Sequence, residues 1–213
     1  MLFSMQMCES ESSDLNGLLI AASLRAVAKF KGTGSRGEHY ASVLLLNCRS
    51  MLEPVIPDST AGFYHSGILK TFHATETEPL LKLATRITND VNEAVKNRKH
   101  FTDMGDLNML MAQAMGHPAL TPSASMRTAL ISNVREPPCH DADKESTSYL
   151  NLKDWVTCSS INGVGPCLAL YPDFRYGCLR VSFVYCSPLF SAETMHKLVD
   201  DISSMLNNLD DQL

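Results

Sequence analysis

The sequence predicts an α/β (α+β) fold, in which helices cover a mixed, largely antiparallel sheet. Segments with helical periodicity lie mainly in the first half of the chain and strand-like segments mainly in the second half. That order is typical of a sheet with its helices on one face. The 213 residues are 45% hydrophobic, which is enough apolar material for one sizeable core.

The first helix is predicted at residues 14–30, with Asp14 positioned to cap its start. Apolar residues occur on almost all of its faces, which is typical of a helix packed deeply in a core. A glycine-rich turn at 32–37 leads to a strand at 39–48. After a loop that contains prolines, a second strand is expected at 64–73.

The clearest amphipathic helix is predicted at residues 78–98. Thr77 is expected to cap it, and Pro79 falls in its first turn, where a missing N–H is tolerated. Its apolar residues recur at helical spacing and share one face: Leu80, Ala84, Ile87, Val91 and Ala94. A shorter helix is expected at 104–115.

The second half of the chain has the patterns of strands. Short strands are predicted at 126–133, 150–160 and 165–171, with a polar loop at 135–148. The strand at 178–186 has the cleanest alternation, and one of its faces is apolar, at Leu179, Val181, Phe183 and Tyr185.

The last predicted helix covers residues 191–207, with Ser191 as its N-cap. No repeat and no clear linker interrupts the pattern. We therefore expect one domain at residues 12–207, preceded by a flexible N-terminus at residues 1–11.

The composition argues against several classes of function. The formal net charge is −5 and the 18 Lys and Arg residues are scattered, whereas nucleic-acid binding needs clustered positive charge. No run of about 18 apolar residues is present for a membrane span, and the N-terminus lacks the pattern of a signal peptide. Seven cysteines without a CxxC pair favour a reducing, cytoplasmic compartment, and they predict no zinc site.

One glycine motif matches a cofactor-binding pattern. Gly32, Gly34 and Gly37 fit GxGxxG, but they follow a predicted helix and precede a predicted strand. A dinucleotide site needs the opposite order, with the phosphates at a helix N-terminus. A simple helix-to-strand loop is therefore expected, and no bound cofactor is predicted.

Two groups of polar residues also resemble reactive clusters. His196 and Asp200 have an HxxxD spacing, but within the last predicted helix they are expected to form a solvated pair at i and i+4. The residues at 140–143 combine a histidine with two aspartates, in a polar loop without a second ligand group at a useful spacing. No metal site is predicted.

Several short motifs occur in an order that resembles a known family. Asn16 to Ala22 fit N-x-x-L-x-A-A, Asn47 to Arg49 fit N-x-R, and a loop closes near Gly62 to Tyr64. Ser132 and Asn133 fit the start of an S-N-x-G strand, although Arg135 replaces the usual glycine. In this order the motifs resemble the C-terminal half of the chloramphenicol acetyltransferase-like acyltransferases, which include condensation domains, alcohol acetyltransferases and plant-type acyltransferases.

The resemblance implies a protein of two similar halves that face each other across a tunnel for acyl donor and acceptor. In this family the catalytic histidine lies in an HHxxxDG motif of the first half and takes a proton from the acceptor. The strand end that echoes this position, Val184 to Pro188, contains no histidine. No catalytic residue is therefore predicted in this chain.

Three residues are expected to bind substrate along the tunnel: Ser132, Asn133 and Arg49. The alternatives are that Ser132 and Asn133 only cap the end of a strand, and that Arg49 forms a structural ion pair or is solvated.

Two functions remain open. The first is the C-terminal half of an enzyme that transfers an acyl group from a thioester such as acyl-CoA to an alcohol or amine, and that is inactive alone. Its expected partners are an N-terminal half or a second copy, together with small-molecule acyl donors and acceptors. The second is a non-catalytic binding or scaffolding protein that keeps the fold. A large exposed apolar surface favours the first function, and a closed polar surface favours the second.

Overall fold

A computed structural model of the protein describes residues 15–57, 59–116, 127–132, 156, 158–159, 166–175, 178–187 and 189–209. The elements, in chain order, are α2 (Leu15–Phe30), β1 (Glu38–Asn47), the 3-10 turn η1 (Arg49–Met51), β2 (His65–Ala74), α3 (Leu80–Lys96), α4 (Lys99–Met115), β3 (Arg127–Ser132), β4 (Pro166–Arg175), β5 (Cys178–Tyr185) and α5 (Ala192–Asn207). The predicted succession of helices and strands is thus confirmed, except that the described residues of the strand predicted at 150–160, which are 156, 158 and 159, belong to no strand.

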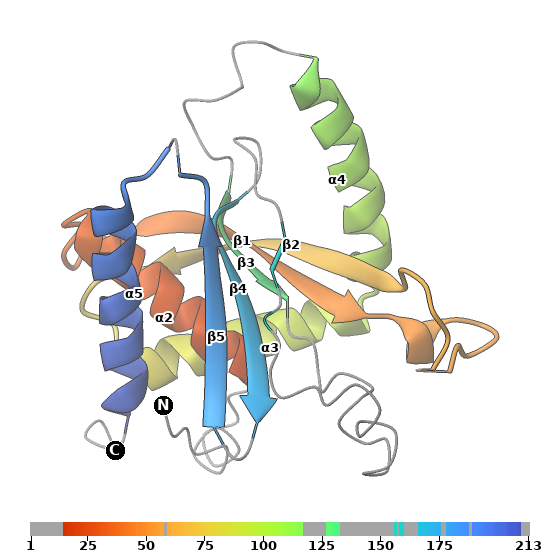
Figure 1. Cartoon of the computed structure of the whole chain (residues 1–213), viewed down its shortest axis with the longest axis horizontal. Helices are drawn as coiled ribbons and strands as arrows, with labels where there is room; N and C mark the ends of the chain where they lie inside the picture. Colours follow the sequence, from red (N-terminus) through yellow and green to blue (C-terminus); the bar gives the residue numbers. More distant parts are fainter. Residues whose placement is uncertain are drawn as a thin grey trace.

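The strands form one five-stranded sheet in the order β2-β1-β3-β4-β5 (Figure 1). Two parallel pairs, β1–β3 and β3–β4, lie in the middle, and the antiparallel pairs β1–β2 and β4–β5 lie at the two edges. Helices α2, α3 and α5 lie together beside the sheet, as Figure 1 shows. The α/β class with a mixed sheet is therefore confirmed.

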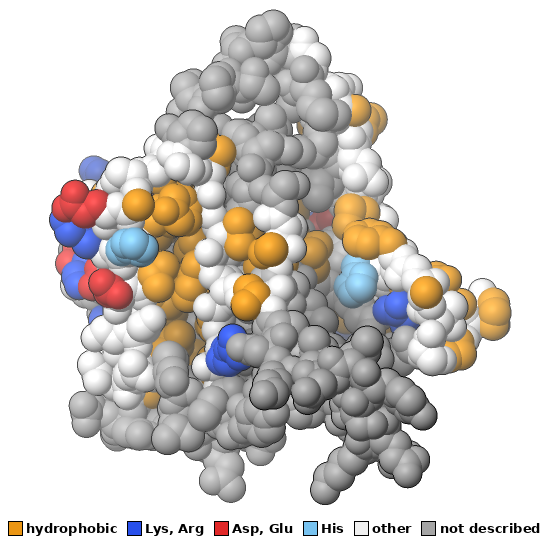
Figure 2. Space-filling model, in the orientation of Figure 1, with side chains coloured by type: hydrophobic (Ala, Val, Ile, Leu, Met, Phe, Trp, Pro, Cys, Tyr) orange, Lys and Arg blue, Asp and Glu red, His pale blue; other side chains and the backbone are white. Residues whose placement is uncertain are grey.

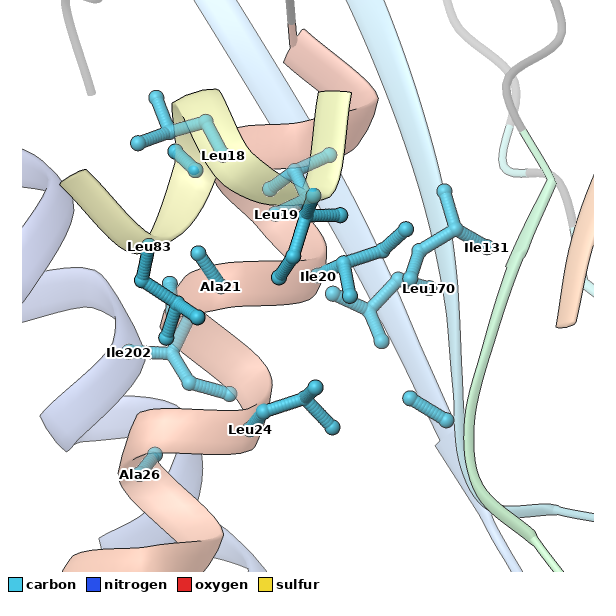
Figure 3. Packing of buried hydrophobic residues seen from close by; sticks show 14 of the residues in the cluster. Leu18, Leu19, Ile20, Ala21, Leu24, Ala26, Leu83, Ile131, Leu170 and Ile202 are labelled. Carbon is cyan, nitrogen blue, oxygen red and sulfur yellow. The ribbon is translucent and has the colours of Figure 1, made fainter. Parts of the chain in front are cut away.

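Helix α2 lies at the centre of the hydrophobic core. Its residues Leu18, Leu19, Ala21 and Leu24 are fully buried, as its apolar character on almost all faces predicts. Figure 3 shows Ile20 pointing toward Ile131 of β3 and Leu170 of β4, and Leu83 of α3 and Ile202 of α5 beside Ala21. The helix therefore contributes to the contact with the sheet and also to the contacts with both neighbouring helices.

Helix α3 starts later than its sequence pattern predicts. Pro79 occupies the N-cap with an extended backbone, and no side chain caps the helix, so the prediction of Thr77 as the cap was wrong. Because Pro79 has no N–H, nothing is lost by placing it before the first helical turn. Thr75 Oγ1 instead accepts a hydrogen bond from the backbone N–H of Glu78, at 3.0 Å, in the turn that precedes the helix.

Helix α4 starts five residues earlier than predicted and lies along the outer strand β2. Ser66 Oγ donates a hydrogen bond to the carbonyl of His100, and Asp103 accepts one from the backbone N–H of Leu69, with 3.3 Å between N and Oδ2. Beyond this contact α4 rises away from the sheet (Figure 1). These hydrogen bonds link residues 34 positions apart, so local sequence patterns do not reveal where α4 begins.

The last strand and helix agree closely with prediction. The apolar face of β5, at Leu179, Val181, Phe183 and Tyr185, packs against the core. Ser191 caps α5 by accepting a hydrogen bond from the N–H of Thr194, at 3.1 Å. The predicted cap Asp14, the polar loop at 135–148 and most of the predicted strand at 150–160 lie outside the described residues. In the described part of the chain, no helix combines the length and the apolar character needed to cross a membrane.

Candidate functional site

The parallel strands bring two of the predicted substrate-binding residues to the same end of the sheet. Ser132 ends β3 and lies in register with Leu45 of β1. Four residues after Leu45, Arg49 opens the 3-10 turn that follows β1. Asn133 lies outside the described residues. The carboxyl ends of parallel strands are where open α/β sheets most often bind ligands, so this corner of the sheet is the candidate site.

Arg49 is held within its own loop. Its Nη2 donates to the carbonyl oxygens of Thr60 and Gly62, at 3.1 and 3.2 Å, and its guanidinium lies 4.9 Å from the ring centre of Tyr64. Nη1 also donates to Asn47 Oδ1, at 3.4 Å. These contacts close the loop between β1 and β2, which is a structural role. Substrate binding by Arg49 stays a prediction, and in the geometry seen here most of its donors are already used.

No sequence motif singles out His65, which lies at this same end of the sheet. Its Cα is paired with that of Asn47, and its ring lies 5.5 Å from the ring of Phe63. His65 belongs to no motif of the family, and only the register of β2 against β1 places it near Arg49 and Ser132. His100, whose carbonyl accepts a hydrogen bond from the neighbouring Ser66, also lies close to this end of β2, but it is buried at 2% exposure, whereas His65 is partly exposed.

Two cysteines near the ends of strands are poorly suited to act as nucleophiles. Burial raises the pKa of the Cys48 thiol, and it raises the pKa of Cys167 to about 11. A thiol attacks as its thiolate, and a raised pKa leaves little thiolate near neutral pH. Both thiols donate to backbone carbonyls, Cys48 to that of Leu46 and Cys167 to that of Thr128. They behave as structural side chains.

The other polar clusters form no site. His196 and Asp200 are both exposed on α5, and the structure records no ion pair between them. The predicted solvated position is thus confirmed, although the predicted pair is absent. The residues at 140–143 lie outside the described part of the chain. Among the described residues, no group of three or more His, Cys, Asp or Glu side chains could hold a metal ion.

The glycine motif forms a turn and not a phosphate-binding loop. Gly32, Gly34 and Gly37 all have positive φ angles, between 55° and 64°, and connect the end of α2 to the start of β1. The backbone therefore runs from a helix through the glycines into a strand, as the sequence predicts. The order that a dinucleotide site requires is the reverse.

The fold matches solved structures over almost the whole chain. Polyketide synthase associated protein 5 from Mycobacterium tuberculosis matches with a TM-score of 0.62 and 14% identity, over 96% of this chain and 47% of that chain. A trichothecene 15-O-acetyltransferase from Fusarium sporotrichioides matches with a TM-score of 0.65 and 14% identity, over 95% and 43%. The EpoB NRPS cyclization-docking bidomain from Sorangium cellulosum matches with a TM-score of 0.62 and 14% identity, over 96% and 38%.

No protein-family model matches the chain, and no curated protein matches its sequence. The chain spans less than half the length of each of the three solved structures it matches. At such low identity the agreement lies in the arrangement of helices and strands. The chain thus has the fold of the chloramphenicol acetyltransferase-like acyltransferases and condensation domains, as its ordered motifs predict.

Proposed function

We propose that this chain is the C-terminal half of an acyltransferase-like enzyme, which transfers an acyl group from a thioester such as acyl-CoA to an alcohol or amine. In this proposal the chain is inactive until an N-terminal half supplies the HHxxxDG histidine. The observation that carries the proposal is the extent of the structural match. Between 95% and 96% of this chain is matched, but only 38% to 47% of the three proteins described above.

An exposed apolar surface supports the need for a partner. Eight large hydrophobic side chains are exposed in the described residues, and six of them lie on two projections from one corner of the sheet. One projection is the loop between β1 and β2, with Met51, Val55 and Phe63. The other is α4, with Phe101, Met109 and Leu110. Figure 1 shows the course of both projections, and Figure 2 shows hydrophobic side chains on their surfaces.

We call the six side chains on this loop and on α4 the corner surface. Phe63 is 80% exposed, which is unusual for a large aromatic side chain, and the cluster is typical of a surface that a partner covers. The loop of the corner surface follows β1 at the same end of the sheet as Arg49 and Ser132, and the first turn of α4 lies beside the start of β2 at that end. A half that docks there would close a tunnel beside the predicted substrate-binding residues.

The proposed chemistry divides between the two halves. The N-terminal half supplies the general base, whose loss costs about 10²–10⁴-fold in rate. This chain supplies one wall of the tunnel, where Ser132 and Asn133 are proposed to bind substrate and to donate hydrogen bonds to the developing oxyanion. Acyl-CoA is then a co-substrate and not a resident cofactor. The free thiols of Cys48, Cys158, Cys167 and Cys186 support the proposal of a reducing, cytoplasmic location.

A non-catalytic binding role is the second candidate, and one comparison favours it. The X-domain from teicoplanin biosynthesis has this fold, with a TM-score of 0.58 and 16% identity, and its structure is known in complex with OxyB. The fold therefore also occurs in a complex with a different protein. In that case the corner surface would bind a protein that is not an acyltransferase half.

The test is reconstitution with N-terminal halves that carry HHxxxDG, taken from the same genome. We expect one of them to bind the chain and to restore release of free thiol from acyl-CoA in the presence of an alcohol or amine. Phe63→Ser should weaken that binding, because the exposed ring is proposed to be buried in the complex. Phe30→Ser is the matched control, since Phe30 is also exposed, at 59%, but lies at the end of α2.

The outcomes separate the two candidates. Binding without thiol release, equally sensitive to Phe63→Ser, would favour the scaffolding role. If no half binds, or if Phe30→Ser weakens binding as much as Phe63→Ser, the corner surface is not the docking site and the proposal fails.

A further inference from the structure

The two edge strands of the sheet, β2 and β5, differ in whether another part of the chain covers their outer side. At the β2 edge, α4 lies against the strand, and the Asp103 carboxylate accepts the hydrogen bond of the outward N–H of Leu69. An edge strand protected in this way is a poor template for another strand. At the opposite edge, residues 181–185 of β5 form backbone hydrogen bonds to β4 alone within the described part of the chain.

The core-facing side chains of β5 are also less buried than those of the neighbouring strand β4. Leu168 and Leu170 of β4 are 1% and 0% exposed. Their partners on β5, Tyr185 and Phe183, are only partly buried, although they face the same core. Helix α5 packs on α2, and Figure 2 shows hydrophobic side chains at the surface between α5 and β5. A further strand beside β5 would cover these side chains.

The sequence of β5 does not oppose pairing. Residues 178–185 contain one charged residue, Arg180, and no proline. Natural edge strands usually avoid association through charges, prolines or bulges. The chemistry of the strand therefore suits an uncharged partner strand that is apolar on the same face.

We propose that β5 is the docking edge for a second copy of this chain, with the two β5 strands pairing antiparallel across a two-fold axis. The axis must be perpendicular to the sheet, so residues of the same face stand opposite one another. With Ser182 at the axis, Val181 faces the second copy's Phe183, and Leu179 faces its Tyr185. The core-facing apolar side chains of β5 in one copy thereby contact the same side chains of the second copy. A strand with polar residues on that face would not make these contacts.

A second copy is favoured over an unrelated strand by this self-complementarity and by the protected edge at β2. Among the described residues only the β5 edge is open, so pairing through it ends at two copies and does not continue into a fibre. The β5 edge and the β2 edge lie at opposite sides of the sheet. The dimer is therefore independent of the N-terminal half proposed above, and either proposal can fail without the other.

The test uses charge exchange at Ser182, which lies at the two-fold axis on the face away from the core. Molar mass is measured by sedimentation equilibrium over a range of concentrations. The unsubstituted chain should dimerise, and Ser182→Lys and Ser182→Glu should each raise the dissociation constant by roughly tenfold, because like charges then face each other. An equimolar mixture of the two variants should recover the dimer. Thr71→Lys, on the exposed surface of the other edge strand, should change nothing.

Recovery in the mixture also shows that both variants are folded. The proposal is overturned if the unsubstituted chain is monomeric at every concentration, or if it forms larger assemblies. It is equally overturned if Ser182→Lys leaves the dimer unchanged, or if the mixture does not recover it.

Discussion

At the scale of single residues, His100 combines deep burial with unsatisfied polarity. It is 2% exposed, and neither Nδ1 nor Nε2 has a hydrogen-bond partner among the described residues. Its carbonyl, in contrast, accepts from Ser66 Oγ where α4 meets β2. Burial lowers the pKa of the imidazole, and the nearby charge of Arg98 lowers that pKa further. Folding therefore favours the neutral form of His100.

Because the pKa of His100 is lower in the folded protein, the protein should become less stable as the pH falls. Well above pH 6.5, the ordinary pKa of histidine, the imidazole is neutral in both the folded and the unfolded state, so it adds no pH dependence. As the pH falls through 6.5, the unfolded chain protonates this imidazole more readily than the folded chain does, because the folded pKa is lower. The free energy of unfolding therefore decreases. Urea unfolding at a series of pH values should show this decrease. His100→Leu should reduce it, whereas His196→Gln, at an exposed position, should leave it in place. An unchanged slope in His100→Leu would contradict the account.

Residue-scale contacts are also what the sequence predicts least well. The N-x-R motif marks Arg49 as notable, but its bonds to Thr60 and Gly62 depend on how the loop closes. The same holds for His65, whose place beside Asn47 comes from strand register. Ser132 was located at the carboxyl end of a strand correctly, because its position depends only on the local pattern. The sequence thus predicts where the residues of the candidate site lie better than it predicts which contacts they make.

At the scale of elements, α2 and α3 cross closely because Gly17 has no side chain. A Cβ added there would overlap Thr88 Oγ1 and lie 3.0 Å from the carbonyl oxygen of Ala84, both on α3. Gly17→Ala should therefore destabilise the protein by about 1–3 kcal/mol through overpacking, despite the better helix propensity of alanine. Gly105→Ala is the matched control.

Gly105 lies on the exposed part of α4, and a Cβ there would meet nothing within 4 Å. Its substitution should be neutral or stabilising by about 0.5–1 kcal/mol. Chemical denaturation of both variants gives the comparison. If both substitutions changed the free energy of unfolding equally, the close approach of α2 and α3 at Gly17 would not contribute to stability.

The elements with strong local patterns were predicted well. The apolar character of α2, the alternation of β5 and the Ser191 cap of α5 each reflect forces that act within one segment. The start of α4 was missed because Arg98, with φ of 56°, ends α3, and α4 begins directly afterwards. The helix is then fixed by contacts with β2, which are distant in sequence.

At the scale of the whole molecule, the proposed half-enzyme rests on how much of the longer matched structures the chain covers, which is 38% to 47%. The chain has the fold of much longer acyltransferases and condensation domains, and it exposes the corner surface beside the predicted substrate-binding residues. The strand end that we expect to echo the catalytic motif reads Tyr185, Cys186 and Ser187, without a histidine. Each observation agrees with a half-enzyme that provides a wall of the tunnel and lacks the base.

The most direct measurement is release of free thiol from acyl-CoA by the isolated chain, with a range of alcohols and amines as acceptors. We expect no turnover above the uncatalysed rate, either in the unsubstituted chain or in His65→Ala and His196→Ala. Robust turnover by the isolated chain would contradict it. If that turnover disappeared in His65→Ala but persisted in His196→Ala, the catalytic base would lie within this chain, at the corner of the sheet.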